Sequence, residues 1–419
     1  MINMQKTFSP YQIFIITILT ITQFTVILDF MVLSPLGAIL LKELSITTAQ
    51  FGMVVSAYAF SAGASGLLAA GFADKFDRKK LLLFFYIGFI IGTALCAIAT
   101  DYIFLLTARI ITGLFGGVIG SICYAIVTDL FKIEVRGRVM GFLQMAFAGS
   151  QVLGIPTGLY FANLMGWHSP FWLIVLLSIV IALVIAVKMK PIDSHLKLQK
   201  KVNALSHLGK TISQIQYLKA FAATTLLATG GFMLMPFAST YNVNNMGINL
   251  DDLPLLYMVT GVCSMATGPV IGKLSDSKGK FTVFLFGSIL TIIIVLIYCN
   301  LGLTPLWGAM LISIFMFIGV SSRMIPSQAL LSAVPSPQDR GAFMSINSSV
   351  MQVSGGIATF IAGTIIVQRD SGYLENYDRL GYVVSSAMVI SAIMIYYLNG
   401  YVKAKIAKES KPAVEVGAA

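Results

Sequence analysis

Long apolar segments alternate with short polar segments along almost the whole chain. Each apolar segment is long enough for a helix that crosses a bilayer, which needs about 20 residues. The segments lie at 11–36, 48–72, 81–99, 103–127, 139–163, 169–188, 218–243, 253–274, 281–300, 304–328, 341–367 and 380–402. Helix-length segments exclude a transmembrane β-barrel, whose strands are much shorter and alternate in polarity. The pattern therefore predicts an all-α integral membrane protein with twelve transmembrane helices.

The composition supports this prediction and excludes several classes of protein. Of the 419 residues, 57% are hydrophobic and 11% are charged, whereas about 25% of residues are charged in soluble domains. Such a chain is neither a soluble enzyme nor a nucleic-acid-binding domain. Its net charge of +11 has to be explained instead by where the basic residues lie relative to a membrane.

The basic residues predict the orientation of the chain. An even number of spans places both termini on one side, and Lys and Arg are enriched in cytoplasmic loops. With cytoplasmic termini, only Lys42, Arg369 and Arg379 fall outside, Arg109 and Arg323 lie within spans, and the other 23 of the 28 Lys and Arg residues are cytoplasmic. The short loops fit a bacterial cytoplasmic (inner) membrane. We therefore expect a multi-pass protein of that membrane, with basic loops that face anionic lipid headgroups.

The longest polar segment divides the chain into halves. Residues 188–217 contain six lysines and one acid, Asp193, and we interpret them as a cytoplasmic linker. The predicted domains are a first six-helix bundle at 1–187, a second at 218–402, and a cytoplasmic C-terminal tail at 403–419. His168, His195 and His207 all lie outside the predicted spans, so we expect no metal site and no histidine proton relay in the membrane.

Matching loop sequences recur in the two halves. Asp74 follows the second span and Asp276 follows the eighth, 202 residues later. Arg136-Gly-Arg-Val-Met precedes the fifth span and Arg340-Gly-Ala-Phe-Met precedes the eleventh, 204 residues later. Two matched signals at nearly one offset indicate a duplicated six-span unit, and parallel repeats of this kind build one class of secondary transporters.

These loops resemble a signature of the major facilitator superfamily. The family pattern is G-x-x-x-D-R/K-x-G-R/K between spans 2 and 3, repeated more weakly between spans 8 and 9. The second copy here is matched by Gly272, Asp276, Gly279 and Lys280. The first copy keeps Asp74, Lys75, Arg78 and Lys79, but has Ala70 and Asp77 where the pattern has glycine. The resemblance extends from the first span to the twelfth and implies two pseudo-symmetric six-helix bundles that work as a monomer.

Two further segments extend the resemblance. Arg109-x-x-x-Gly113-x-x-x-Gly117 resembles the span-4 signature of the family, and glycines four residues apart let two helices pack closely. In span 5, Gly154, Pro156 and Gly158 partly match the G-P-x-x-G-G pattern associated with antiporter branches. A proline kink that packs span 5 is the alternative explanation, so the direction of transport stays open.

Three charged residues fall inside the predicted spans, where a charge costs at least ~2.5–3.5 kcal/mol. They are Asp29, Arg109 and Arg323. At ~1.5 Å per residue, Asp29 and Arg109 both lie about 10 Å below the outer surface, in spans 1 and 4, which the family packs as neighbours. Loss of water favours protonation of a carboxylate, and a nearby arginine opposes it. We interpret the two as a proton-coupling pair, like that of the drug:proton antiporter branch, or else as a permanent structural pair.

Arg323 lies nearer the cytoplasm than Arg109. We consider three roles for it: anion binding in the cavity, a side chain extended to the inner surface, or pairing with carbonyl groups at helix ends. Polar and methionine-containing helix faces would line the rest of a cavity of mixed polarity. The candidates are Thr22 and Thr25 on span 1, Gln144 and Gln151 on span 5, Met233 and Phe237 on span 7, and Ser348 and Gln352 on span 11.

The family resemblance also implies a cytoplasmic gate. Asp74 would meet the end of a second-half helix near Arg340, and Arg78 would pair with Asp129. Asp276 would do the mirrored job, with Arg136 and Lys280 completing the set of gate residues.

These features predict secondary active transport by alternating access of two bundles. The first hypothesis is proton-coupled efflux of small amphipathic organic compounds, driven by the proton gradient without a cofactor. The alternative is a proton-coupled importer or facilitator of a nutrient such as a sugar, nucleoside or organic anion. A solute receptor or membrane enzyme is a remote third hypothesis, since the sequence contains no nucleophile–base pair or nucleotide-binding loop. The expected partners are the small-molecule substrate, protons and the lipid bilayer.

Overall fold

The computed structural model describes residues 8–69, 75–131, 133–193, 196, 213–336 and 339–409. Within these residues, twelve helical segments are long and apolar enough to cross a membrane, and each coincides with one predicted segment. The first half contains α1 (Pro10–Val32), α2 (Gly37–Glu43), α3 (Thr48–Ala69), α4 (Arg78–Ala97), α5 (Tyr102–Leu130), α6 (Ile133–Gly149), the π-turn η3 (Ser150–Gly154), α7 (Ile155–Met165) and α8 (Ser169–Lys188).

The second half also contributes six of the membrane-spanning segments. It contains α10 (Ile215–Phe232), the 3₁₀ turns η5 (Met235–Phe237) and η6 (Leu250–Asp252), α11 (Ala238–Asn244), α12 (Leu253–Lys278), α13 (Lys280–Tyr298), α14 (Leu306–Ala333), α15 (Arg340–Ile365), the strands β1 (Val367–Gln368) and β2 (Leu374–Glu375), and α16 (Tyr377–Glu409).

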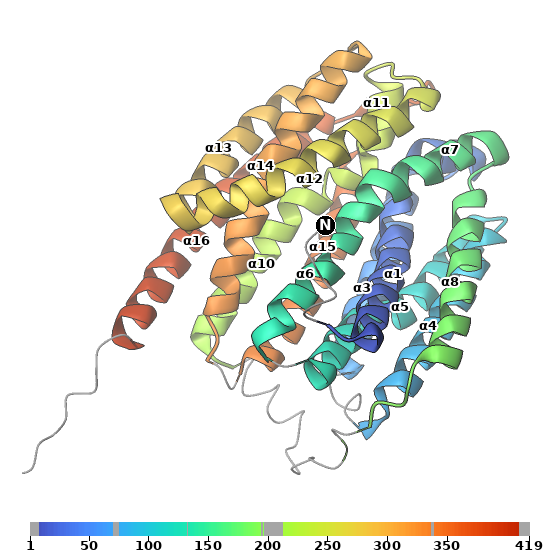
Figure 1. Ribbon diagram of the computed structural model, residues 1–419. Coiled ribbons are helices and arrows are strands. Elements are labelled where there is room, and N and C mark those ends of the chain that lie inside the picture. The colour runs from blue at the N-terminus through green and yellow to red at the C-terminus, as the bar shows by residue number, and fades with distance from the viewer. Residues whose placement is uncertain are drawn as a thin grey trace, which may run out of the picture.

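The helices form two bundles that lie side by side, α1 to α8 in one and α10 to α16 in the other (Figure 1). In the first bundle, α3 and α4 pack against α5, and in the second, α12 and α13 pack against α14. Between the bundles, α3 packs against α15, and α12 packs against η3 and α7. Because these pairs join span 2 to span 11 and span 8 to span 5, the contacts follow the pseudo-symmetry of the repeat.

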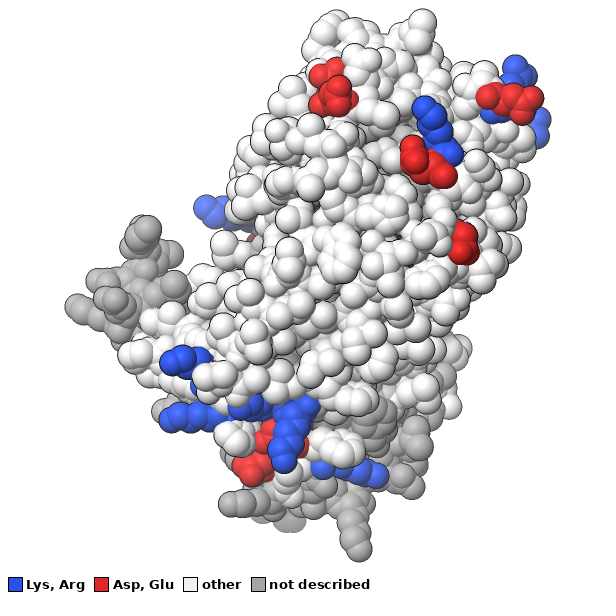
Figure 2. Space-filling view, turned by 90° about the vertical axis from the view of Figure 1, so that its right-hand side faces the viewer, with Lys and Arg blue, Asp and Glu red and all other residues white. Residues whose placement is uncertain are grey.

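The two ends of the molecule differ in what they carry. We call the end with Lys188 of α8 and Ile215 of α10 the linker end, and the end with the β1–β2 pair the hairpin end; they are the lower and upper ends in Figure 1. Charged side chains gather towards these two ends, and a wide uncharged area separates them on the face shown in Figure 2. Contact with lipid hydrocarbon requires a surface of this kind without charged side chains.

Two spans that the sequence predicts as continuous helices are interrupted. Proline has no N–H to donate and its ring crowds the carbonyl of the fourth preceding residue, so Pro156 is preceded by a π-turn at Ser150–Gly154 that separates α6 from α7. Pro236 lies in the 3₁₀ turn Met235–Phe237 that separates α10 from α11. The first span is also shorter than predicted, since α1 ends at Val32 and a separate helix, α2, follows.

The hairpin end contains a short antiparallel strand pair that the all-α prediction lacks. Val367 pairs with Glu375 and Gln368 with Leu374, and the turn between them is made by Gly372 at a φ of +86°, a value that glycine adopts without strain. The side chain of Asn245 holds Leu374 by two hydrogen bonds of 2.9 Å, one to each backbone polar group. The strand pair is therefore fastened to the end of span 7.

Candidate functional site

The buried carboxylate of span 1 and the buried arginine of span 4 meet inside the first bundle. α1 begins at a capping box made by Ser9 and Gln12, with Pro10 at its first position, and Asp29 lies in its last turn. α5 begins where Asp101 accepts a hydrogen bond from the backbone of Phe104, and Arg109 follows about two turns later. The positions at which α1 and α5 begin, and the distance of each residue from its helix start, thus bring Asp29 and Arg109 to the same depth. Their spacing in the sequence predicts this.

Asp29 and Arg109 form a direct ion pair. Arg109 Nη1 lies 2.8 Å from Asp29 Oδ2, and both side chains are 0% exposed. Thr93 of α4 donates a hydrogen bond of 3.1 Å to the other carboxylate oxygen. Tyr58 of α3 places its ring 4.5 Å from the guanidinium carbon of Arg109. Four helices of one bundle therefore contribute to the site.

The arginine is incompletely satisfied in this arrangement. Its Nε and Nη2 atoms are buried and have no hydrogen-bond partner among the described residues, so the ring face of Tyr58 is what stabilises that side of the cation. A buried ion pair is stable when its remaining donors are also satisfied. The pair is thus held by one strong contact, and a modest rearrangement around Arg109 would change it.

Sequence analysis did not identify Thr93 or Tyr58 as part of the site. Each is a single polar or aromatic residue in an apolar span, and nothing in its spacing marks it. Only the packing of α3 and α4 against α5 brings them to the charges. The aligned depths of Asp29 and Arg109, by contrast, were visible in the sequence.

Several predicted cavity residues are packed inside the protein in this conformation. Thr22 and Thr25 are 0% exposed; Thr22 donates to the carbonyl of Ile18, and Thr25 bonds to the carbonyl of Thr22 and to the hydroxyl of Tyr86. They therefore do not line an accessible cavity here.

The two span-7 candidates are also buried and line no accessible cavity in this conformation. Met233 is 1% exposed and Phe237 is 0% exposed, and the ring of Phe237 packs edge-on against Phe51 of the first bundle at 5.8 Å. These side chains contribute to the contact between the bundles.

The remaining cavity candidates lie closer to the surface between the bundles. Gln151 and Gln352 are half-buried and Ser348 is exposed. The backbone of Gln151 packs against Gly261 of α12. A Cβ atom added at Gly261 would lie 3.0 Å from the carbonyl oxygen of Gln151. The side chain of Gln144 lies outside the described residues.

Arg323 is buried in the second bundle and does not extend to the inner surface, while its role in anion binding stays a prediction. Its side chain is 4% exposed, so it does not extend to a surface. Its Nη2 donates a 3.0 Å hydrogen bond to Ser391 of α16, and its guanidinium carbon lies 5.7 Å from the ring centroid of Phe284 of α13. Its Nη1 also lies 3.3 Å from the position of a Cβ atom added at Gly230 of α10, so the guanidinium lies among α10, α13 and α16 of the second bundle.

The gate prediction falls partly within the described residues. Arg78 Nε lies 3.0 Å from Asp129 Oδ2, so the structure contains the ion pair that the family resemblance implies. Asp74 and the side chains of Arg136 and Arg340 lie outside the described residues. Asp276 is exposed and Lys280 is half-buried at the linker end of the second bundle.

Asp77, which stands where the family pattern has glycine, forms a hydrogen bond with the start of the linker. Its Oδ1 accepts the backbone N–H of Lys80 and caps α4, and its Oδ2 accepts the backbone N–H of Ile192 at 2.8 Å. The backbone N–H of Arg78 donates to the carbonyl of Ile192 at 3.0 Å. Residues at the start of the linker are therefore bound to the loop that contains the predicted gate.

The predicted packing residues are at close helix contacts. A Cβ atom added at Gly117 would lie 2.5 Å from Ala62 of α3, and one at Gly113 would overlap the hydroxyl of Ser61. Gly154 and Gly158 face α1 in the same way, at 2.6 Å from Leu28 and 2.9 Å from Val32, and Pro156 is buried between them.

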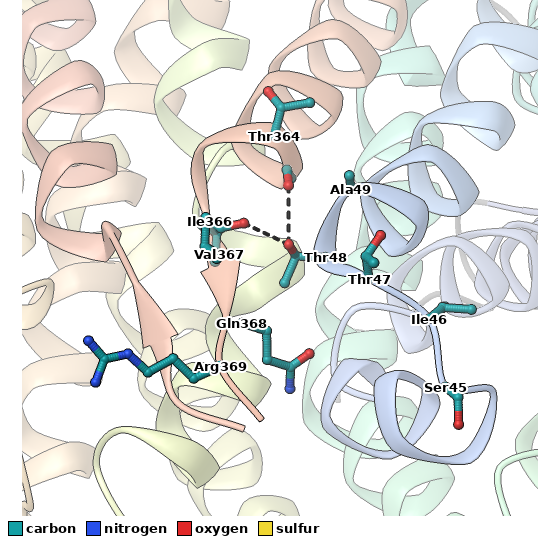
Figure 3. Close-up of a pocket in the computed structure, with 11 residues that line it drawn as sticks. Ser45, Ile46, Thr47, Thr48, Ala49, Thr364, Ile366, Val367, Gln368 and Arg369 are labelled. Atoms are coloured by element: carbon teal, nitrogen blue, oxygen red, sulfur yellow. Dashed lines mark hydrogen bonds between the residues drawn. The ribbon is translucent and has the colours of Figure 1, made fainter. Parts of the chain in front are cut away.

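The bundles are joined at the hairpin end. Thr48 of α3 donates hydrogen bonds to the carbonyls of Gly363 and Ile366 at 3.2 and 2.7 Å, next to a pocket of about 600 Å³ (Figure 3). Ser239 donates to the carbonyl of Ser34 at 3.0 Å. These hydrogen bonds join the two bundles at the hairpin end.

Contacts are sparser along α6 and α12 towards the linker end. A Cβ atom added at Gly141 on α6, or at Gly268 or Gly272 on α12, would meet no described atom within 4 Å. These three positions therefore contact no described neighbour, whereas α12 packs closely at Gly261, nearer the hairpin end.

Comparison with known proteins agrees with this architecture. The sequence model of the Major Facilitator Superfamily matches residues 19–359 and 220–416. The chain belongs to the major facilitator superfamily. It is therefore a membrane transporter of two six-helix bundles and not an enzyme, as the sequence predicts.

Individual relatives are distant but cover most of the chain. The chain is 24% identical over 337 residues to the MFS-type transporter YceJ of Bacillus subtilis (strain 168), covering 80% of this chain and 85% of that protein. It is 23% identical over 339 residues to a probable sugar efflux transporter of Helicobacter pylori (strain G27), covering 80% and 83%. The fold is similar to that of a bacterial homologue of the human lysosomal transporter Spinster in an inward-facing, occupied conformation, with a TM-score of 0.75 at 15% identity over 94% of this chain and 98% of that one.

Proposed function

We propose that the protein is a proton-coupled exporter of small amphipathic organic compounds. The observation that carries this proposal is the Asp29–Arg109 pair, a carboxylate and an arginine held 2.8 Å apart without exposure to solvent. An ion pair has no net charge and therefore tolerates burial better than a single charge does. When the pair separates, the carboxylate of Asp29 can take a proton. The name of the Helicobacter relative, a sugar efflux transporter, and the partial span-5 motif support the outward direction.

The proposed cycle uses the two ends of the molecule in turn. In one state of this cycle the inter-bundle hydrogen bonds at the hairpin end hold that end closed, and a solute enters between the bundles from the linker end, which we place in the cytoplasm on the basis of the basic loops. Rocking of the bundles then opens the hairpin end and releases the solute. A proton from outside binds Asp29 in that state, and its release to the cytoplasm after the return drives the cycle in one direction.

The sealed environment of the pair gives the coupling its physical basis. Because Asp29 and Arg109 are 0% exposed, bulk solvent does not reach the carboxylate in this conformation, and in our proposal proton exchange takes place in a different one. A solute drives the change only if it binds the two conformations with different affinity. We further propose that the protein functions as a monomer in a bacterial cytoplasmic membrane, with both termini cytoplasmic.

Solute-dependent proton movement in liposomes tests the proposal. The purified protein is reconstituted with a pH dye inside and no initial gradient, and a panel of organic cations, neutral amphiphiles, sugars and organic anions is added outside. Alkalinisation of the lumen, lost in Asp29→Asn and retained in a control that makes the same change at the exposed Asp370, supports proton antiport through Asp29. Acidification would show symport and replace export by uptake. Unchanged proton flux in Asp29→Asn would make the pair structural.

A further inference from the structure

A row of three aromatic rings joins the buried ion pair to the opposite bundle. Phe30 directly follows Asp29 on α1 and lies with its ring centroid 5.3 Å from that of Tyr58 and 6.0 Å from that of Phe232 on α10. Tyr58 is the residue whose ring faces the Arg109 guanidinium at 4.5 Å. We call Tyr58, Phe30 and Phe232 the aromatic row. It runs from the cation in the first bundle to the second bundle.

The end of the row at Arg109 supports the side of the guanidinium that lacks hydrogen bonds. Nε and Nη2 of Arg109 have no partner among the described residues, and a cation in an apolar site gains most from an aromatic face when water is excluded. Tyr58 is 2% exposed. Its position therefore affects how firmly Arg109 is held beside Asp29.

The other end of the row is fixed to the second bundle. Phe232 is the last residue of α10, just before the break around Pro236. Its ring packs against Gly355 of α15, where an added Cβ atom would lie 3.0 Å away. Any movement of the second bundle relative to the first therefore changes the contact between Phe232 and Phe30.

We propose that the aromatic row is the device by which movement of the bundles controls the ion pair. While the hairpin end is closed, Phe232 supports Phe30, Phe30 supports Tyr58, and the ring of Tyr58 holds Arg109 against Asp29. When the bundles separate at that end, Phe232 withdraws, Tyr58 gains freedom, and the hold on Arg109 weakens. Asp29 then becomes able to take a proton. The inference rests on the proposed function, and it makes Tyr58, Phe30 and Phe232 positioning residues.

A chemical probe of Asp29 tests the row without knowledge of the solute. A hydrophobic carbodiimide reacts with protonated carboxyl groups in apolar surroundings, and mass spectrometry measures the labelled fraction of Asp29 with time in the reconstituted protein. We expect Phe232→Leu and Tyr58→Leu to raise the labelling rate about tenfold, which is the ratio equivalent to about 1.4 kcal/mol and within the range of a cation–π contact away from water. Tyr58→Phe keeps the ring and should label at the parent rate.

A second ring contact between the bundles provides the matched control. Phe237 packs against Phe51 at 5.8 Å and forms no ring pair with the aromatic row among the described residues, so Phe237→Leu should leave the labelling rate of Asp29 unchanged. Equal acceleration in Phe237→Leu would show general loosening of the bundles and overturn the inference, as would an unchanged rate in Phe232→Leu. Phe232→Met, whose flexible apolar side chain adapts to an irregular gap, provides the same comparison if the leucine variant does not fold.

The same preparations separate this inference from the proposed function. Solute-driven proton flux is measured on the parent protein beside the labelling. If labelling follows the expected order but no solute moves protons, the row controls the pair and the proposed proton coupling is wrong. If solutes move protons but Phe232→Leu does not change the labelling rate of Asp29, the proposed proton coupling stands and the proposed role of the aromatic row is wrong.

Discussion

Replacing Arg109 by leucine is expected to destabilise the protein, and adding Asp29→Asn is expected to restore most of the loss. The single change leaves a carboxylate without exposure to solvent and with one remaining side-chain partner, the hydroxyl of Thr93 at 3.1 Å. Breaking a buried pair by removing one partner costs about 3–5 kcal/mol, whereas removing both charges is much cheaper. The asymmetry between the single and the double variant is thus the specific signature of this pair.

The expected shift in unfolding temperature follows from the size of the chain. An unfolding entropy of about 2.1 cal/mol/K per residue turns a loss of about 3–5 kcal/mol into a decrease of roughly 3–6 °C for a chain of this length. Cys96, Cys123 and Cys299 are free and buried, so a thiol-reactive dye reports unfolding in detergent without an added label. An Arg109→Leu protein that unfolds at the parent temperature, or a double variant no more stable than the single, would refute the reasoning.

Three further outcomes are expected. Arg323→Met should unfold at or above the parent temperature in the same assay, because Arg323 donates to the hydroxyl of Ser391 and not to a carboxylate, and replacing a buried charge by an apolar side chain is often neutral or stabilising; a clear decrease would contradict this. Asp77→Asn should speed amide hydrogen exchange at Ile192 at least severalfold and leave the rest of α4 unchanged, since asparagine keeps the cap but loses one acceptor; unchanged exchange at Ile192 would count against the linker contact. Gly117→Ala should lower the unfolding temperature by several degrees while Gly141→Ala should not, since only the first added methyl group meets a neighbouring helix; equal effects would show that this packing is unimportant.

The sequence predicts what depends on length, polarity and order along the chain. All twelve spans follow from the apolar segments, because each must cross the same thickness of hydrocarbon. The contact between Asp29 and Arg109 follows from their depths in neighbouring spans, and the contact between Arg78 and Asp129 follows from the family pattern. These features need no knowledge of how a helix is rotated about its axis.

The rotation of a helix about its axis and local breaks in its backbone are not specified by the sequence pattern. Thr22 and Thr25 share a polar face with Asp29, yet that face turns into the first bundle and its hydroxyls bond to neighbouring groups. Arg323 turns towards α13 and α16 for the same reason. The π-turn before Pro156 depends on how α6 and α7 pack against α1 and α12, which spacing alone does not specify.

The central claim is that Asp29 couples proton movement to solute movement, and one comparison tests it most directly. With a solute identified in the liposome panel, Asp29→Asn is measured in two assays: exchange of labelled for unlabelled solute at equilibrium, and uphill transport driven by a pH gradient. The account predicts that the variant keeps exchange, because the bundles still move, and loses the uphill transport. Uphill transport at the parent rate in Asp29→Asn would contradict it.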